Sequence, residues 1–276
     1  MKILALISHT FRELAARLTL IVLAGISTLI LLVVALSVSS SETADGKTLM
    51  VFGNPSGPPV SADQFARLVQ LFEATAAGGL FLGVIVFGVF ATAGIIPDTL
   101  ERGIVDLYLS KPIARWQLLL GRTLGAIAVM LANVLYFIGG LWLIMGARLG
   151  VWNTPFLLSA FTLTLVFSAL YSVVVFLGVA TRNTAIAIIG AFLYLIGVAA
   201  LLYHRESFLF LFSSNTVYRG FFDVLYALLP QTSAMQDAVK QQIMNLPMDW
   251  KPFAQSVLSS AAIFLCGACV LRKRDF

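Results

Sequence analysis

The sequence predicts an all-α integral membrane protein with six transmembrane helices in one domain, residues 1–276. Apolar residues make up 59% of the chain and charged residues only 11%, whereas about a quarter of the residues in a soluble domain are charged. Several stretches without charge reach the roughly 20 residues that a helix needs to cross a bilayer. The predicted spans cover about residues 18–38, 78–97, 123–145, 156–180, 184–203 and 253–271.

The segment before the first span predicts an amphipathic helix in the membrane interface. Residues 2–17 place apolar side chains at roughly the i, i+3, i+4, i+7 spacing of one helix face, with charged side chains between them. A cleaved signal peptide is the alternative, with Ala35-Leu-Ser37 as the cleavage site. The apolar run is longer than the about 7–15 residues of such a peptide and follows an amphipathic helix. We therefore expect a retained first span.

Residues 39–77 predict an external segment, because they are polar and contain a cluster of Gly and Pro. The run 48–52 is suited to a strand. Ser61-Ala-Asp-Gln64 is typical of a capping box, and it predicts an external interfacial helix before span two. The expected apolar face of this helix contains Phe65, Leu68, Val69 and Phe72.

The second half of the chain contains residues that mark where its predicted spans begin and end. Pro155 is suited to the first turn of span four, and residues 181–183 predict a tight turn before span five. The larger external segment covers residues 204–252. Within it, 226–230 is an apolar stretch that ends at a proline, and a capped amphipathic helix is expected from Thr232 onward, before span six.

The distribution of positive charge predicts that both termini are cytoplasmic. In this orientation, eleven of the 18 Lys and Arg residues fall in the inner segments, although the inner segments are the shorter ones. Positive residues near cytoplasmic helix ends set the orientation of membrane proteins. The net charge of +5 therefore needs no nucleic-acid partner to explain it.

The connection between spans two and three, residues 98–122, concentrates charge in a short cytoplasmic stretch. The order Thr99-Leu-Glu-Arg-Gly103, Leu107-x-Leu109-Ser110-Lys111-Pro112, Arg115 and Gly121-Arg122 resembles the first cytoplasmic loop of ABC-2 type transporter permeases. The resemblance implies a coupling helix that docks on a separate ATP-hydrolysing subunit. The alternative is an amphipathic surface helix whose basic side chains meet anionic lipid headgroups.

The resemblance also implies roles for individual residues of this loop. Glu101 and Arg102 would contact the ATPase, Gly103 would permit close approach, and Asp106 departs from the Leu that the family often has there. The implied coupling residues are Glu101, Arg102, Gly103, Asp106, Ser110, Lys111, Pro112 and Arg115. The N-terminal helix would pack beside the loop as a connecting helix.

At the level of the whole assembly, the resemblance implies a bacterial inner-membrane permease, itself not an enzyme. Two permease copies, most simply a homodimer, would sit on a cytoplasmic ABC ATPase that holds ATP and Mg²⁺, and they would export a solute between them. This chain itself would hold no cofactor. The loop and the long first outer segment are also similar to permeases grouped with multicopper-enzyme and nitrous-oxide-reductase maturation.

The predicted spans contain no Asp, Glu, Lys, Arg or His at mid-depth, which disfavours an ion-coupled carrier because such carriers need intramembrane charge. Five polar residues could line a substrate path, although hydrogen bonding between helices is the reading that we favour for each. They are Asn133, Tyr136, Ser168, Tyr171 and Ser172. The glycine pairs 79/83 and 121/125 would allow close helix approach at spans two and three.

Three further patterns indicate little chemistry. Residues 45–48 end like a phosphate loop, but Ser41 stands where the first glycine is required, so no ATP site is expected in this chain. Cys266 and Cys269 share a helix face and could hold Cu(I), but packing is the simpler explanation in an apolar helix, and we expect no metal site. His9 and His204 lie near opposite membrane faces, so no enzymatic site is expected.

A second function from a different class also fits the sequence. A membrane scaffold or signal transmitter would use the external segments 39–77 and 204–252 to bind an extracytoplasmic accessory protein, and its inner loop to contact an ATPase, without moving a solute. In either case the spans would contact membrane lipid.

Overall fold

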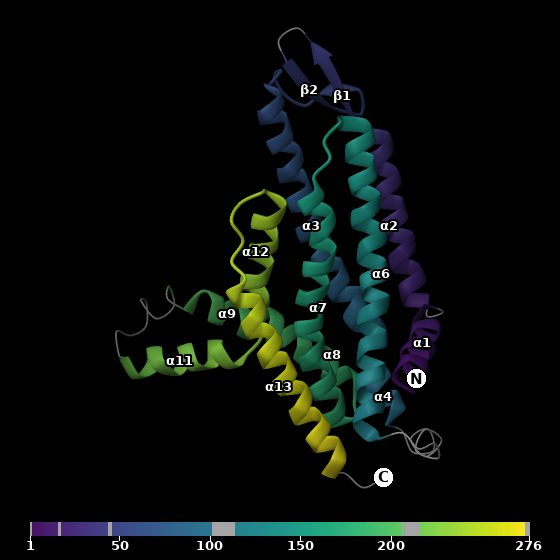
Figure 1. The fold of residues 1–276 in the computed structure, drawn as a ribbon, viewed down its shortest axis with the longest axis vertical. Coiled ribbons are helices and arrows are strands. Elements are labelled where there is room, and N and C mark those ends of the chain that lie inside the picture. The colour runs from purple at the N-terminus through teal and green to yellow at the C-terminus, as the bar shows by residue number, and fades with distance from the viewer. Residues whose placement is uncertain are drawn as a thin grey trace.

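The chain folds into an elongated bundle of helices with a small antiparallel sheet at one end (Figure 1). The structure, a computed structural model, describes residues 2–15, 18–43, 46–100, 114–205, 207 and 216–273. Its elements are α1 (Lys2–Ala15), α2 (Leu18–Ser37), β1 (Val38–Thr43), β2 (Gly46–Val51), β3 (Asn54–Pro55), α3 (Ala62–Thr92), α4 (Ile95–Thr99), α6 (Arg115–Leu149), α7 (Thr154–Thr181), α8 (Thr184–Phe192), η1 (Leu193–Ala199), α9 (Ala200–Tyr203), α11 (Thr216–Leu228), α12 (Thr232–Ile243) and α13 (Lys251–Lys273). We call the end with the sheet the hairpin end, and the end with α1, α4 and the last turn of α13 the termini end (Figure 1).

Within the described residues, five helical segments are long and apolar enough to span a membrane, as expected for an all-α multi-pass membrane protein. They are Ala62–Thr99, Arg115–Leu149, Thr154–Thr181, Thr184–Tyr203 and Lys251–Lys273. The first predicted span corresponds to α2, but the apolar segment found there, Ile21–Ser37, is shorter. The count of six spans therefore stays a prediction.

Helix α7 forms the centre of the bundle and packs against α6, α8, α12 and α13. Its sequence is apolar on every side, which is the pattern of a helix enclosed by others. Pro155 lies in its first turn, as predicted. The predicted tight turn follows its end: Arg182 adopts a left-handed conformation with φ of 54°, and the Asn183 side chain accepts hydrogen bonds from the first amides of α8.

Helix α3 corrects the prediction of a separate external helix before span two. The capping box is confirmed, because the Ser61 side chain accepts from the amide of Gln64 and the Gln64 side chain accepts from that of Ser61. The helix then continues without a break through Gly78 and Gly79 to Thr92. In a bilayer, an interrupted helix would leave backbone groups without partners, so two glycines are not enough to end it.

The predicted boundaries of the connection between spans two and three also change. Helix α4 occupies residues 95–99, and α6 begins at Arg115 rather than after residue 122. Residues 115–122 are therefore helical, and α6 extends well beyond the predicted span on both sides. Residues 101–113 lie outside the described part of the chain.

The hairpin end consists of a three-stranded sheet in the order β1-β2-β3. Strand β2 confirms the strand expected near residues 48–52, whereas β1 was not predicted. Strand β1 follows α2 directly and pairs antiparallel with β2, which places Glu42 opposite Lys47. The hydrogen bond from the Lys47 ammonium group, together with its charge, lowers the pKa of the Glu42 carboxyl.

The segment before the last span contains two helices with different surroundings. Helix α12 confirms the predicted amphipathic helix but not its cap, because Gln231 at the N-cap makes no side-chain capping hydrogen bond. The apolar face of α12 is buried against the bundle rather than placed at a lipid interface. The buried residues on this face are Met235, Ala238, Val239 and Ile243. Helix α11 lies across the long axis of the molecule (Figure 1), and its Asp223 accepts a hydrogen bond of 2.8 Å from Arg205.

Candidate functional site

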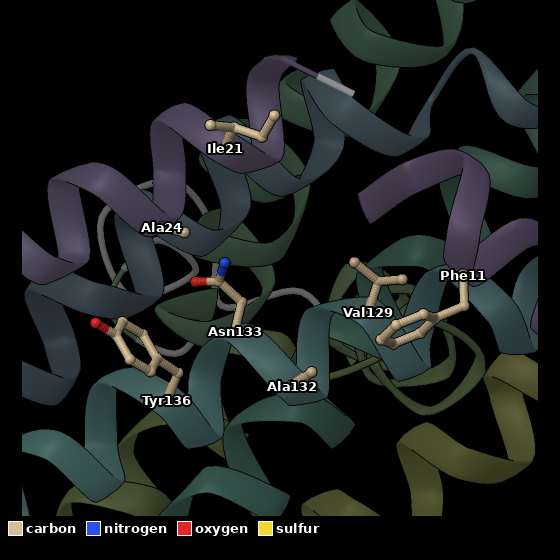
Figure 2. Close-up of a pocket in the computed structure, with 7 residues that line it drawn as sticks. All are labelled: Phe11, Ile21, Ala24, Val129, Ala132, Asn133 and Tyr136. Carbon is tan, nitrogen blue, oxygen red and sulfur yellow. The ribbon is translucent and has the colours of Figure 1, made fainter. Parts of the chain in front are cut away.

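Two of the five predicted path residues, Asn133 and Tyr136, line a groove between α2 and α6 (Figure 2). The groove has a volume of about 350 Å³. Its other lining residues are Phe11, Ile21, Ala24, Val129 and Ala132. The site is therefore built from three elements, and α6 contributes the largest share.

Helix periodicity explains why these residues meet. Val129, Asn133 and Tyr136 are spaced i, i+4 and i+7 along α6, so they share one face of the helix. Ile21 and Ala24 are spaced i, i+3 on α2 and face them, and Phe11 of α1 closes one side of the groove (Figure 2). The wall is thus apolar except for the amide of Asn133 and the hydroxyl of Tyr136.

The two polar side chains of the groove, Asn133 and Tyr136, differ in their hydrogen bonds. The Thr28 hydroxyl lies 2.8 Å from that of Tyr136 and donates to the Ala24 carbonyl at 2.8 Å. Because a threonine hydroxyl has one proton, Tyr136 is the donor of the shared bond. The Asn133 Oδ1 atom is buried and has no hydrogen-bond partner among the described residues, and its amide points toward α2 (Figure 2). This arrangement suits an apolar molecule that carries one hydrogen-bond donor.

The other three predicted path residues lie on α7, away from this groove. The Tyr171 hydroxyl donates to the Thr92 carbonyl at 3.1 Å and ties α7 to the end of α3. Ser168 and Ser172 donate to carbonyls of their own helix, those of Leu165 and Ala169. The structure does not bring these three residues together with Asn133 and Tyr136.

Most of the predicted coupling residues, Glu101 to Pro112, lie outside the described residues, and Arg115 is the exception. It stands in the first turn of α6, where its guanidinium donates to the Leu271 carbonyl near the end of α13 at 3.3 Å. Arg115 thus joins two helix ends at the termini end.

Next to it, α1 packs closely along the first half of α6 through the glycine pair 121/125. A Cβ added at Gly121 would stand 2.7 Å from the Cβ of Leu6, and one at Gly125 would stand 2.6 Å from the Cβ of Thr10. Real Cβ contacts are not that short, so only glycine allows this approach. The pair does allow close helix contact, as predicted, but the partner is the N-terminal helix rather than another span.

A buried ion pair lies within the same contact. The Arg122 guanidinium, with only 5% of its side chain exposed, contacts the carboxylate of Glu13 from α1. His9 lies 3.8 Å from that carboxylate on the preceding turn of α1. We call Leu6, Thr10, Glu13, Gly121, Arg122 and Gly125 the α1–α6 seam.

A fully buried carboxyl, that of Glu73 of α3, was not expected from the sequence. Its Oε2 atom accepts from Asn153 Nδ2 at 2.6 Å, and the same amide donates to the Ile243 carbonyl at 2.9 Å. This network joins α3 to the start of α7 and the end of α12. Val69 and Ala77, one turn before and after Glu73, are both buried, so the periodicity of α3 could have placed it on the inner face.

The two cysteines lie near the end of the last helix. Cys266 and Cys269 are both free and exposed on α13. Within the described residues, no group of three or more His, Cys, Asp or Glu side chains is placed to hold a metal ion.

Neither the known protein-family models nor the curated proteins compared with the chain give a match.

Proposed function

We propose that the chain is the membrane-spanning permease subunit of an ABC transporter and couples to a separate cytoplasmic ATPase through the region of residues 98–122. The observation that carries the proposal is the α1–α6 seam. It makes the N-terminal helix and the start of α6 one packed unit. The start of α6 is also the last part of residues 98–122, the charged stretch whose sequence resembles an ABC-2 coupling loop.

The length of α6 supports a mechanical link between coupling and transport. The helix covers 35 residues, and at about 1.5 Å per residue it reaches from the termini end to the hairpin end. Its first turns hold Arg115, Arg122 and the seam glycines, and its middle holds Asn133 and Tyr136 of the groove. A displacement imposed on the seam is therefore transmitted along the same helix to the groove.

In this proposal the termini end faces the cytoplasm, and the ATPase supplies the ATP and Mg²⁺ sites. Nucleotide-driven closure of two ATPase copies would push on residues 98–122 and α1 together. Two permease copies would enclose the path, and export is the direction that the resemblance favours. The groove would contact an apolar solute, with the Asn133 amide as its polar contact.

Purification from the native membrane in mild detergent tests this proposal. We expect a stoichiometric ATP-binding subunit to co-elute and to hydrolyse ATP. Glu101→Lys should leave the chain in the membrane but weaken the association and uncouple hydrolysis from transport, because like charges brought together at an interface repel each other. Asp63→Lys is the matched control, since Asp63 is an exposed carboxylate in the first turn of α3, near the hairpin end.

Two results would overturn the proposal. A chain that purifies alone or with a partner that is not an ATPase would make the resemblance misleading and favour the scaffold function. Unchanged transport by Glu101→Lys, at equal expression, would remove Glu101 from the coupling site.

A further inference from the structure

We propose that a crevice between α2 and α3 binds one acyl chain of a membrane lipid. The inference stands on a different part of the molecule from the seam and does not rest on the proposed function. Two cavities of about 260 and 170 Å³ form the crevice. Both are lined by Val34 and Phe72, so they adjoin each other, one between the helices and the other against strand β2 of the hairpin.

The lining of the crevice selects hydrocarbon over water. Its walls are mostly carbon, and Ser27 and Ser37 are the two hydroxyl-bearing residues among the lining residues. The Ser37 hydroxyl, at the upper end, already donates to the Val34 carbonyl of its own helix. Water is retained in a cavity only where it finds two to four polar partners, and apolar cavities stay dry. An empty cavity would leave its walls without dispersion contacts, so a hydrocarbon chain is the occupant that suits this space.

The exposure of the walls shows from which side the occupant enters. Leu23 and Leu141, at the floor, are 3% and 1% exposed. Ile26, Ile30 and Phe72, at the rim, are 36%, 41% and 39% exposed. Because the rim lies on apolar helices, the medium at the opening is the hydrocarbon of the bilayer.

Two glycines of α3 keep the crevice open. Gly79 and Gly83 line it, and a Cβ added at either position would have no atom within 4 Å. Gly140 of α6, which faces α2, differs: an added Cβ there would stand 2.6 Å from the side chain of Leu31. The pair 79/83 therefore does not bring two helices together and instead leaves space beside α3.

The shape of the upper cavity excludes a helix of a second copy as the occupant. Leu49 and Val51 of β2 cover it, while Val69 of α3 and Leu149 of α6 form two of its sides. A helix with its side chains is about 10–12 Å across and does not fit beneath the hairpin. A slender, flexible chain does, with the lipid headgroup left outside the crevice.

Lipid retention by the purified chain tests the proposal. The intact protein, in complex with whatever partner it retains, is washed in detergent, and co-purifying lipid is quantified by native mass spectrometry. We expect about one lipid per chain, and about a tenfold loss in Gly79→Leu or Gly83→Leu, because a leucine side chain would occupy the space of the acyl chain. Gly78→Leu is the matched control: it adds the same side chain one residue away, with equally open surroundings, outside the crevice lining.

A second measurement uses the unmutated protein, so that a loss of folding stability in the glycine variants cannot affect the result. A lipid with a diazirine in its acyl chain is reconstituted with the protein and photolysed, and the labelled residues are mapped. Labelling of Leu23 or Leu141 at the floor supports the proposal. Three results would each overturn it. The first is labelling confined to the rim and other exposed positions, and the second is equal lipid retention in Gly78→Leu and Gly79→Leu. The third is release of the bound molecule upon ATP turnover, which would identify a transported solute instead of a resident lipid.

Discussion

The α1–α6 seam and the α2–α3 crevice both contain glycines four residues apart, yet only the seam is closed. At Gly121 and Gly125, the side chains of α1 stand where a Cβ would be. At Gly79 and Gly83 that space is empty. The spacing by itself therefore permits close approach without specifying it.

The difference lies in what the neighbouring helix brings to the glycines. Helix α1 carries Glu13, which contacts the buried Arg122 and fixes the position of α1 beside α6. Helix α2 presents only apolar side chains and two serines to the crevice, so nothing directional draws it onto α3. In a bilayer, where apolar surfaces gain little by leaving lipid, a polar contact of this kind decides which faces close.

The largest effect is expected when the ion pair of the seam is broken. Glu13→Ala leaves Arg122 buried without this carboxylate, and loss of one partner of a buried pair costs about 3–5 kcal/mol. Since Glu13 is one-third exposed, we expect a loss at the lower end, about 3 kcal/mol. Unfolding in detergent micelles with increasing SDS measures it.

The double variant Glu13→Ala with Arg122→Met serves as the control. Replacing both members of a buried pair by apolar groups is often nearly neutral, so the double variant should regain most of the lost stability. A double variant that is less stable than Glu13→Ala would contradict the view that the ion pair positions α1.

The same small change at one glycine of each region gives effects of opposite sign. Alanine favours a helix over glycine by about 1 kcal/mol, and this gain is equal at both positions. Gly79→Ala should therefore be stabilising, whereas at Gly125 overpacking of about 1–3 kcal/mol should outweigh the gain. Thermal unfolding of the two variants measures the difference.

A double variant tests whether overpacking between residues 10 and 125 causes the loss of stability in Gly125→Ala. Thr10→Gly combined with Gly125→Ala moves the Cβ from α1 to α6 and should recover part of the stability that Gly125→Ala loses. If Gly125→Ala proves as stable as Gly79→Ala, the seam is looser than the structure indicates.

The sequence was informative where a single local rule decides the structure. The capping box at Ser61, Pro155 at the start of α7, the turn at residues 181–183 and the helix from Thr232 were all found from local patterns and are confirmed. Asn133 and Tyr136 line one groove because helix periodicity places them on the same face of α6, and their role in a substrate path stays a prediction.

The features that the sequence did not predict depend on packing between distant segments. The partner of Gly121 and Gly125 is a helix more than 100 residues earlier in the chain. The family resemblance placed that helix beside residues 98–122, but the glycine spacing by itself did not identify it. Glu73 is buried because Asn153 and the end of α12 meet it there. The π-helical stretch η1 lies in the fifth predicted span, and no sequence pattern in that span predicted it.

The smallest effect is expected at the groove between α2 and α6, on the helix that also forms the seam. Tyr136→Phe removes one hydrogen bond to Thr28, and hydrogen bonds between membrane helices are worth on average about 0.6 kcal/mol. A double-mutant cycle with Thr28→Val should give a coupling energy of that size when unfolding in SDS is measured. A coupling as large as that between Glu13 and Arg122 would make the groove a second rigid contact of α6, because α2 would then be held as firmly as α1. A value near zero would instead leave α2 free to separate from α6, and the groove could widen around a bound solute while the seam stays closed.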